Sequence, residues 1–429
     1  MKLNRLYGLI TLIIPFFIAA QQNYKLTKLN NFYSFISVEI SNNEPLVISE
    51  NILFTSIKLE FQQPTELPLK IGYKKTDGSQ NYLTAHISDH ADEGFNGSFS
   101  TPLQVFEIPQ KEVKLDFGNI KGYVKIHLFY AKPINGSIVS NLNKTTNPCD
   151  KPQMISYTEW RAGLPDPKPP KEATEVEHLV VHHSAGSNTD TNYINTVRNI
   201  YLLHTQSNGW DDIGYNFLIA PNGLIFKGRD PQGVADEDNI LGAHFCGKNQ
   251  NTMGVCLMGD FMNARPTEKA VFSLKYLLAW KLKKDRINAF GQTNHPKPSG
   301  SLLNNLCGHR DGCSTDCPGD SLYAMLPKIK AEASRIADSC GLTLSHLNSI
   351  KNKGVTIFPN PSQGFVTLSI NNSISNPSMM VYGLAGNLVF HTSFTPNIPF
   401  EIPLCPGLYF YKLLENKAPF HQSILKIEQ

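Results

Sequence analysis

The run of sequence that says most about this chain is CGHRDGCSTDCPG, at residues 307–319. Within it, Cys317 follows His309 at a short distance, and three glycines allow the backbone to bring both side chains to one point. Upstream, a hydrophobic, strand-like run ends in His182 and His183. Two imidazoles and one thiolate form a three-ligand zinc set. Such a set leaves a fourth position open, as a catalytic zinc requires, whereas a structural zinc has four protein ligands.

Each candidate ligand also has an ordinary structural explanation. Successive side chains of a strand point to opposite faces, so His182 and His183 cannot both face one metal. Taken alone, either histidine could be a satisfied core or surface residue. Cys317 could instead form a disulfide with Cys313 or another cysteine, and the spacing alone leaves both alternatives open.

The first residues predict secretion. Lys2 and Arg5 precede an almost wholly apolar stretch at 9–20, and Ala19-Ala20-Gln21 offers small residues for cleavage. This stretch is short and weakly flanked for a membrane span, so we expect residues 1–20 to be a signal peptide; the alternative is an uncleaved anchor. No other segment approaches the ~20 apolar residues of a spanning helix, so we expect no transmembrane span in the mature chain.

The composition is that of an ordinary globular protein with several domains. The chain has 429 residues, of which 41% are hydrophobic and 17% charged. A net charge of +3 is close to neutral for this length, so we expect no binding of nucleic acid.

Secretion makes disulfides the default state of the eight cysteines. Two of them flank the central region and could join its ends, and two further pairs are close enough in sequence to bond locally. Connectivity cannot be determined from sequence, so all six remain candidates: Cys149 with Cys340, Cys307 with Cys313, and Cys246 with Cys256.

Hydrophobic patterning divides the rest of the chain into three domains. Residues 22–145 contain alternating apolar and polar positions and an Asp77-Gly78 hairpin signal, which predict an all-β accessory domain. Residues 355–429 contain short strands separated by turn signals, which predict a small β-sandwich. We expect both to flank an α/β domain at 149–340.

The central domain alternates strand and helix patterns, which indicates a sheet with packed helices. The expected strands are 179–181, 213–219, 224–226 and 254–258, and the second and third should form a hairpin around Pro221-Asn222-Gly223. The expected helices carry Ile194 to His204, follow a cap at Thr267, and carry Leu322 to Ile336.

Seven motifs of this domain, in order, resemble the family of peptidoglycan recognition proteins and zinc-dependent N-acetylmuramoyl-L-alanine amidases. They cover nearly all of residues 155–337 and include EWRA at 159–162, VHHSAG at 181–186, GWDDIGYNF at 209–217 and PNGLIF at 221–226. The others are GAH at 242–244, MGVCLMGDF at 253–261, and GHRD at 308–311 with CPG at 317–319. The implied fold is a central mixed sheet with helices packed around it.

The resemblance implies one zinc ion on His182, His309 and Cys317. It also implies catalytic roles for Tyr215 and Thr315, where Thr315 stands at a position that holds lysine or threonine in the family. Purely recognising relatives typically lack the cysteine, so Cys317 favours a hydrolase. The expected reaction is zinc-dependent cleavage of the amide between N-acetylmuramic acid and L-alanine in peptidoglycan. The general base is not identified by the sequence.

The same resemblance implies a set of substrate-binding positions. Gly209-Trp210 and Arg229 match the pattern associated with meso-diaminopimelate stems, because a guanidinium can form a forked bond with the extra carboxylate. His183 and His244 lie in matching motifs and are expected beside the substrate.

The last domain resembles the C-terminal sorting domains of type IX secretion. The matching runs are IFPNPS at 357–362, VY at 381–382 and PGLYF at 406–410. The implied partner is the type IX secretion machinery, and the implied location is secreted or associated with the outer surface.

Two other functions are compatible with these motifs. One is a peptidoglycan-binding protein without hydrolysis, and the other is an adhesin whose N-terminal β domain makes the contact. A complete ligand set together with Tyr215 favours the enzyme, because binding alone does not require it.

Overall fold

The computed structural model describes residues 24–62, 68–85, 99–134, 150–169, 172–295, 301–340, 355–370, 375–383, 387–416 and 418–428. The predicted signal peptide lies outside the described residues. The chain forms two compact units. One holds the residues up to Asn143 with Gln153–Leu274 and Gln292–Leu326, and the other holds Lys144–Pro152, Lys275–Gly291 and Pro327–Gln429.

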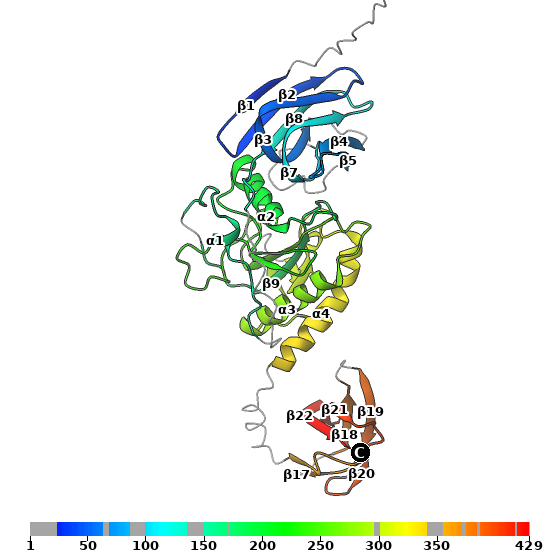
Figure 1. Cartoon of the computed structure of the whole chain (residues 1–429). Coiled ribbons are helices and arrows are strands. Elements are labelled where there is room, and N and C mark those ends of the chain that lie inside the picture. The colour runs from blue at the N-terminus through cyan, green and yellow to red at the C-terminus, as the bar shows by residue number, and fades with distance from the viewer. Residues whose placement is uncertain are drawn as a thin grey trace, which may run out of the picture. The chain divides into compact units, whose positions relative to one another are not determined.

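The N-terminal β region is an eight-stranded sheet, drawn in blue to cyan in Figure 1. Its alternating positions bury one apolar face, which includes Ile57, Leu59, Val113 and Leu115. The predicted Asp77-Gly78 hairpin joins β4 to β5, and Gly78 adopts a positive φ of 81°. The strands are β1 (Lys25–Lys28), β2 (Tyr33–Ile40), β3 (Leu46–Phe61), β4 (Leu69–Lys74), β5 (Gln80–Ala85), β6 (Phe99–Ser100), β7 (Gln104–Asp116) and β8 (Gly122–Phe129).

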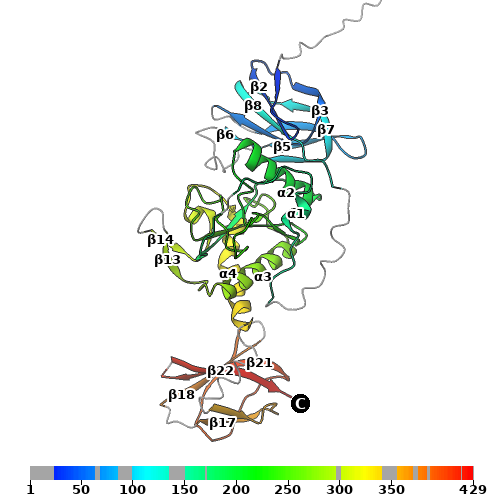
Figure 2. The ribbon, with the colours of Figure 1, turned by 90° about the vertical axis from the view of Figure 1, so that its left-hand side faces the viewer.

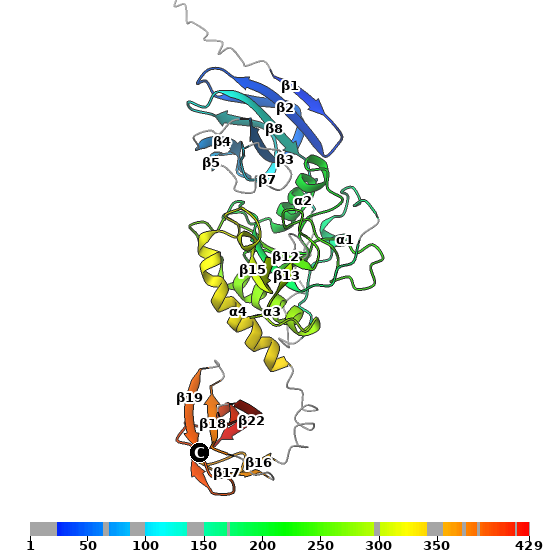
Figure 3. The same cartoon turned by 180° about the vertical axis from the view of Figure 1, so that it is seen from behind.

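The central sheet has the order β11-β10-β12-β9-β15 and is mixed, as expected. Figure 3 labels two of its strands, β12 and β15. Strand β9 lies between β12 and β15 and pairs in parallel with both, while β11 is antiparallel to β10. All six residues of β9 are buried, which explains its continuous apolar run before the histidines. The strands are β9 (His178–His183), β10 (Phe217–Ile219), β11 (Ile225–Lys227), β12 (Thr252–Leu257) and β15 (Leu306–Gly308).

Helices separate these strands in the chain. They are α1 (Tyr157–Trp160), α2 (Tyr193–Leu202), the π-helix η1 (Leu203–Ser207), α3 (Glu268–Lys284), the 3-10 helix η2 (His309–Asp311) and α4 (Asp320–Cys340). The predicted cap of α3 is confirmed, because the Thr267 hydroxyl accepts a hydrogen bond from the Ala270 amide. The expected helix up to His204 changes to a π-helix at Leu203, which the helical spacing did not predict.

A hairpin in the central region was not predicted. Strands β13 (Gln292–His295) and β14 (Ser301–Asn304) pair with each other in antiparallel fashion and are labelled in Figure 2. Their sequence is mostly polar, so it lacks the apolar alternation by which half-buried strands are found.

The N-terminal β region and α2 share one core. Tyr33, Leu103 and Phe129 from the β region belong to the same buried cluster as Val197 and Tyr201 of α2. Buried hydroxyls add a polar contact, because Thr55 and Ser56 both donate to Oδ1 of Asn199 at 2.7 Å. The β region is therefore packed tightly against the central fold along this helix.

The C-terminal region is also built of strands alone over its described residues. A three-stranded sheet, β16-β17-β20, and a four-stranded sheet, β19-β18-β21-β22, contribute to one buried cluster. This agrees with the predicted small β-sandwich. The strands are β16 (Val355–Phe358), β17 (Phe365–Ile370), β18 (Pro377–Tyr382), β19 (Leu388–Ser393), β20 (Phe400–Glu401), β21 (Gly407–Glu415) and β22 (Ala418–Ile427).

The disulfide pattern corrects two predicted pairs. Cys246 bonds to Cys313, with their Cα atoms 6.1 Å apart, so the pairs Cys246–Cys256 and Cys307–Cys313 are wrong. Cys256 and Cys307 lie inside strands β12 and β15 and carry thiols. Cys256 belongs to a different buried cluster from Cys246, whereas Cys307 lies in the same cluster as the Cys246–Cys313 bond.

The third predicted pair joins a described cysteine to one that is not described. Cys340 is disulfide-bonded, and its predicted partner Cys149 lies outside the described residues. Among the described helices, none is both long and apolar enough to cross a membrane.

Candidate metal centre

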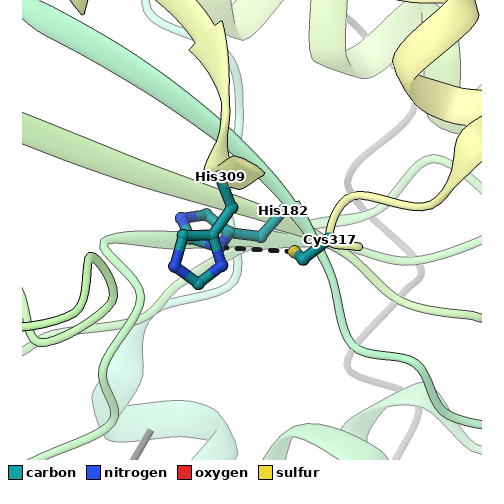
Figure 4. Close-up of side chains that lie close together, drawn as sticks. All are labelled: His182, His309 and Cys317. Carbon is teal, nitrogen blue, oxygen red and sulfur yellow. Dashed lines mark hydrogen bonds between the residues drawn. The ribbon is translucent and has the colours of Figure 1, made fainter. Parts of the chain in front are cut away.

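Three side chains from two segments meet at the end of β9. They are His182, the fifth residue of that strand, His309, the first residue of η2, and Cys317 from the loop beyond it. Their potential ligand atoms all lie within 4.8 Å of one another, and Figure 4 shows the two imidazoles and the thiol converging. All three side chains are fully buried. The structure thus brings together the ligand set that the sequence predicted.

The loop that carries His309 and Cys317 is closed on itself. The Arg310 amide donates to the carbonyl oxygen of Cys317 at 2.9 Å, which fixes the distance between the two ligand positions. Gly319 follows with a φ of +86°, and a Cβ there would lie 2.4 Å from the backbone of Phe261. Only glycine fits this close approach, which explains the third glycine of the run.

The donor set fits a zinc ion. Sγ of Cys317 and Nδ1 of His182 are 3.7 Å apart. Two ligands of a tetrahedral zinc, at ordinary Zn–S and Zn–N lengths, are separated by about 3.5 Å. The backbone amide of His183 also donates to Sγ of Cys317 at 3.4 Å, which favours the thiolate form that binds metal.

A chain of hydrogen bonds continues behind His182. Nε2 of His182 lies 3.0 Å from Nδ1 of His244, and Nε2 of His244 lies 3.2 Å from the hydroxyl of Thr252. Burial lowers the pKa of His244 to about 3, and the positive charge of Arg229 lowers it further in the same direction. His244 is therefore neutral at physiological pH.

Tyr215 lies against the ligand set. It is 4% exposed, and its ring centroid is 5.3 Å from that of His182. His204 of the π-helix also packs against it, with a ring distance of 5.6 Å. Nδ1 of His204 accepts from the Gly214 amide at 3.0 Å, which holds the segment before Tyr215 in place.

The π-helix is the feature that sequence reasoning missed. It directs His204 toward both Tyr215 and Trp210, whose ring lies 4.6 Å from the His204 ring. The helical spacing predicts only that His204 ends a helix. Single π turns often occur at functional sites, but no residue pattern in the sequence announces one.

Thr315 lies two residues before the cysteine ligand. Its hydroxyl oxygen accepts from the Cys317 amide at 3.2 Å, and the residue is partly exposed. Thr315 therefore shapes the loop that carries Cys317, and its catalytic role stays a prediction.

The predicted substrate-binding residues differ in their placement. Trp210 is partly exposed and Gly209, with a φ of +73°, is exposed. Arg229 is 9% exposed, and its Nη1 donates to the carbonyl oxygen of Leu241. Burial lowers the pKa of Arg229, while Asp212 and Asp211 oppose this effect.

Two further predicted substrate contacts are enclosed by protein. His183 is fully buried, and its Nδ1 accepts from the Phe261 amide at 3.2 Å. Its ring is 6.2 Å from that of Phe261, so it is directed away from the ligand cluster, as the alternation along a strand requires. His244 is 1% exposed. These placements favour support of the site over contact with substrate.

Comparison with known proteins places this site in a family. Residues 172–320 match the N-acetylmuramoyl-L-alanine amidase model, and residues 356–427 match the secretion system C-terminal sorting domain model. Peptidoglycan-recognition protein SC2 of Drosophila melanogaster is 31% identical over 172 residues, which cover 40% of this chain and 82% of that protein.

Two further proteins illustrate the range of relatives. A human N-acetylmuramoyl-L-alanine amidase is 30% identical over 179 residues, covering 41% of this chain and 28% of that protein. The solved structure of Drosophila PGRP-LB is 27% identical, covers 40% of this chain and 91% of that one, and superposes with a TM-score of 0.32. The chain belongs to the family of N-acetylmuramoyl-L-alanine amidases and peptidoglycan recognition proteins, and it carries a C-terminal sorting domain.

Proposed function

We propose that this protein is a zinc-dependent N-acetylmuramoyl-L-alanine amidase, which hydrolyses the amide between N-acetylmuramic acid and L-alanine in peptidoglycan. The observation that carries the proposal is the buried cluster of His182, His309 and Cys317 with Tyr215 beside it. Three protein ligands leave room for a water or substrate oxygen, whereas a closed structural site does not. A zinc ion bound there would supply Lewis acidity and lower the pKa of a water toward neutrality.

The chain's own residues would then act on the substrate. The Tyr215 hydroxyl would donate a hydrogen bond to the scissile carbonyl oxygen as negative charge develops on it. Thr315, at the partly exposed side of the loop, would donate a second one. Donors fixed by packing before the reaction cost no reorganisation during it, so they stabilise the transition state effectively. Tyr215 would meet that condition because its buried ring packs against the rings of His182 and His204.

The stem peptide would carry meso-diaminopimelate. Trp210 and Gly209 offer an accessible surface for the stem, and Arg229 offers the cation for the extra carboxylate. Because Arg229 is mostly buried, it would act at the base of the binding site rather than at its rim.

The flanking regions support a secreted enzyme. The sorting domain would direct the chain to the type IX secretion machinery, for an outer-surface or secreted location. The predicted boundaries between 145 and 149 and between 340 and 355 both adjoin residues outside the described ranges, and we retain them as proposed domain limits.

Purified sacculi provide the test. The protein is incubated with sacculi and zinc, and the soluble products are analysed by mass spectrometry for stem peptides with a free L-alanine amine. We expect such peptides with zinc, none with a chelator, and recovery when zinc is restored. Sacculi with lysine stems should react more slowly than those with meso-diaminopimelate.

Matched cysteine variants make the result specific. Cys317→Ser should abolish release of stem peptides, whereas Cys405→Ser should leave it unchanged, because Cys405 is exposed in the C-terminal region. If the protein sediments with sacculi in the presence of zinc but releases no stem peptides, it is the alternative, a non-hydrolysing peptidoglycan-binding protein.

A further inference from the structure

His244 is enclosed next to the candidate metal centre and is directed at one ligand. It is 1% exposed, and its Nδ1 lies 3.0 Å from Nε2 of His182. The two ring planes are nearly perpendicular, at 86°, with centroids 5.0 Å apart. This geometry is that of a directed hydrogen bond between ring nitrogens rather than a stacked pair.

The direction of the bond follows from the next residues in the chain of contacts. The Thr252 hydroxyl donates to the carbonyl oxygen of Asn249 at 2.8 Å, so its oxygen accepts from Nε2 of His244. In a neutral imidazole one nitrogen donates and the other accepts. Nδ1 of His244 is therefore the acceptor, and it receives the Nε2 proton of His182.

This arrangement determines which nitrogen of His182 is available for a metal. With its proton held on Nε2, His182 presents the lone pair of Nδ1, the atom that lies 3.7 Å from Sγ of Cys317. A metal-bound histidine commonly donates its other N–H to a fixed acceptor, which sets both tautomer and ring orientation.

The surrounding backbone is shaped to hold the His244 ring. A Cβ on Gly254 would lie 2.5 Å from the ring, and one on Gly242 would lie 2.4 Å from it, so both positions require glycine. Oδ1 of Asn249 accepts from the amides of His244 and Phe245 at 2.8 and 3.0 Å. The ring therefore has little freedom to turn away from His182.

We infer that His244 is a positioning residue, which fixes the tautomer and orientation of the metal ligand His182 through the chain His182–His244–Thr252–Asn249. It does not contact substrate, contrary to the expectation from its motif. The inference rests on the proposed metal site but not on the bond that the enzyme cleaves.

Zinc affinity, measured by competition with a chromophoric chelator, tests this without any activity assay. In His244→Leu the acceptor for His182 is lost, and we expect zinc affinity to fall about 10- to 100-fold. In His244→Asn the side-chain oxygen can stand near the position of Nδ1, so most of the affinity should return. The thiolate-to-metal absorption of the cobalt-loaded protein should shift in His244→Leu and be close to wild type in His244→Asn.

Variants of Thr252 give an independent measurement if His244→Leu fails to fold. Thr252→Val removes the acceptor for His244 and should weaken zinc binding several-fold, whereas Thr252→Ser should bind as the wild type does. The inference is overturned if folded His244→Leu or Thr252→Val binds zinc with wild-type affinity. It is also overturned if His244→Asn binds as poorly as His244→Leu. A wild-type protein that does not bind zinc would instead refute the metal site itself.

Discussion

The contact between the N-terminal β region and α2 predicts that the two unfold together. Asn199 is fully buried, and its Oδ1 accepts from the hydroxyls of Thr55 and Ser56. Asn199→Leu keeps the side-chain size but removes this acceptor, and it also removes the Nδ2 donor to the carbonyl oxygen and Oδ1 of Asn195 at 2.8 and 3.1 Å. Thr55 has another acceptor, the carbonyl oxygen of Phe129 at 3.2 Å, so the Ser56 hydroxyl bears most of the loss.

The expected loss of stability follows from the different hydrogen bonding of the Thr55 and Ser56 hydroxyls. Leaving the buried Ser56 hydroxyl unsatisfied costs about 1–3 kcal/mol, and loss of the Nδ2 contact with Asn195 contributes about 1 kcal/mol more. We therefore expect Asn199→Leu to lower the free energy of unfolding by about 2–4 kcal/mol. Adding Ser56→Ala removes the orphaned hydroxyl and should restore part of the stability, because replacing both partners by apolar groups is nearly neutral.

Urea unfolding followed by circular dichroism measures the free energy of unfolding. Hydrogen exchange of the backbone amides tests whether the β region and α2 unfold together. Protection should fall together in β3 and in α2, although they are far apart in sequence. Asn43→Ala serves as the control, because the side chain of Asn43 bonds to Asn119 on the surface and should matter by less than about 0.5 kcal/mol. If Asn199→Leu behaves like this control, or destabilises α2 while β3 keeps its protection, the shared core does not couple the two regions.

Three further predictions concern the site and the pH range. Tyr215→Phe should lower kcat about 100-fold or more with little change in KM, measured by release of stem peptides. Replacing Cys246 and Cys313 by serine should weaken zinc binding in the chelator assay while the circular dichroism spectrum stays native, because the bond links the loop after His244 to the ligand loop. Burial lowers the pKa of His127 from 6.5 despite its contact with Glu60, so its neutral form stabilises the fold above pH 6.5. Stability should therefore fall as the pH drops below 6.5, and less so in His127→Gln, by urea unfolding at several pH values.

The fold was predictable wherever side-chain alternation or helical spacing is strong. The apolar run of β9 and the Thr267 cap both give the elements that their patterns predict. The β13–β14 hairpin was not predictable because its residues are mostly polar. The π-helix at Leu203 was not predictable because it directly continues α2, whose apolar residues have α-helical spacing. Local sequence patterns indicate burial and helical or strand period. By these signs the β13–β14 hairpin looks like a loop, and the π-helix looks like the end of an α-helix.

The convergence of the three candidate ligands was predictable for a different reason. His309 and Cys317 lie in one short loop, and the glycines there point to a backbone that bends sharply. Disulfide partners follow no such rule, because Cys246 and Cys313 are 67 residues apart and meet only through the fold. Proximity in sequence therefore suggested Cys307 for Cys313, although β15 holds Cys307 in its ladder.

The disulfide between Cys246 and Cys313 links two loops that surround the candidate metal centre. Cys313 lies between the ligands His309 and Cys317, and Cys246 lies two residues after His244. Fixing those two points restricts both the loop that supplies two ligands and the loop that holds the acceptor for the third. A site with three protein ligands lacks a fourth protein ligand that would help to hold the other three around the metal. The positions of those three side chains must therefore be fixed by the backbone and by neighbouring residues. The covalent link and the His182–His244 bond both restrain the candidate ligands. In the proposed enzyme, such restraint would hold three ligands in place and leave a fourth position for substrate.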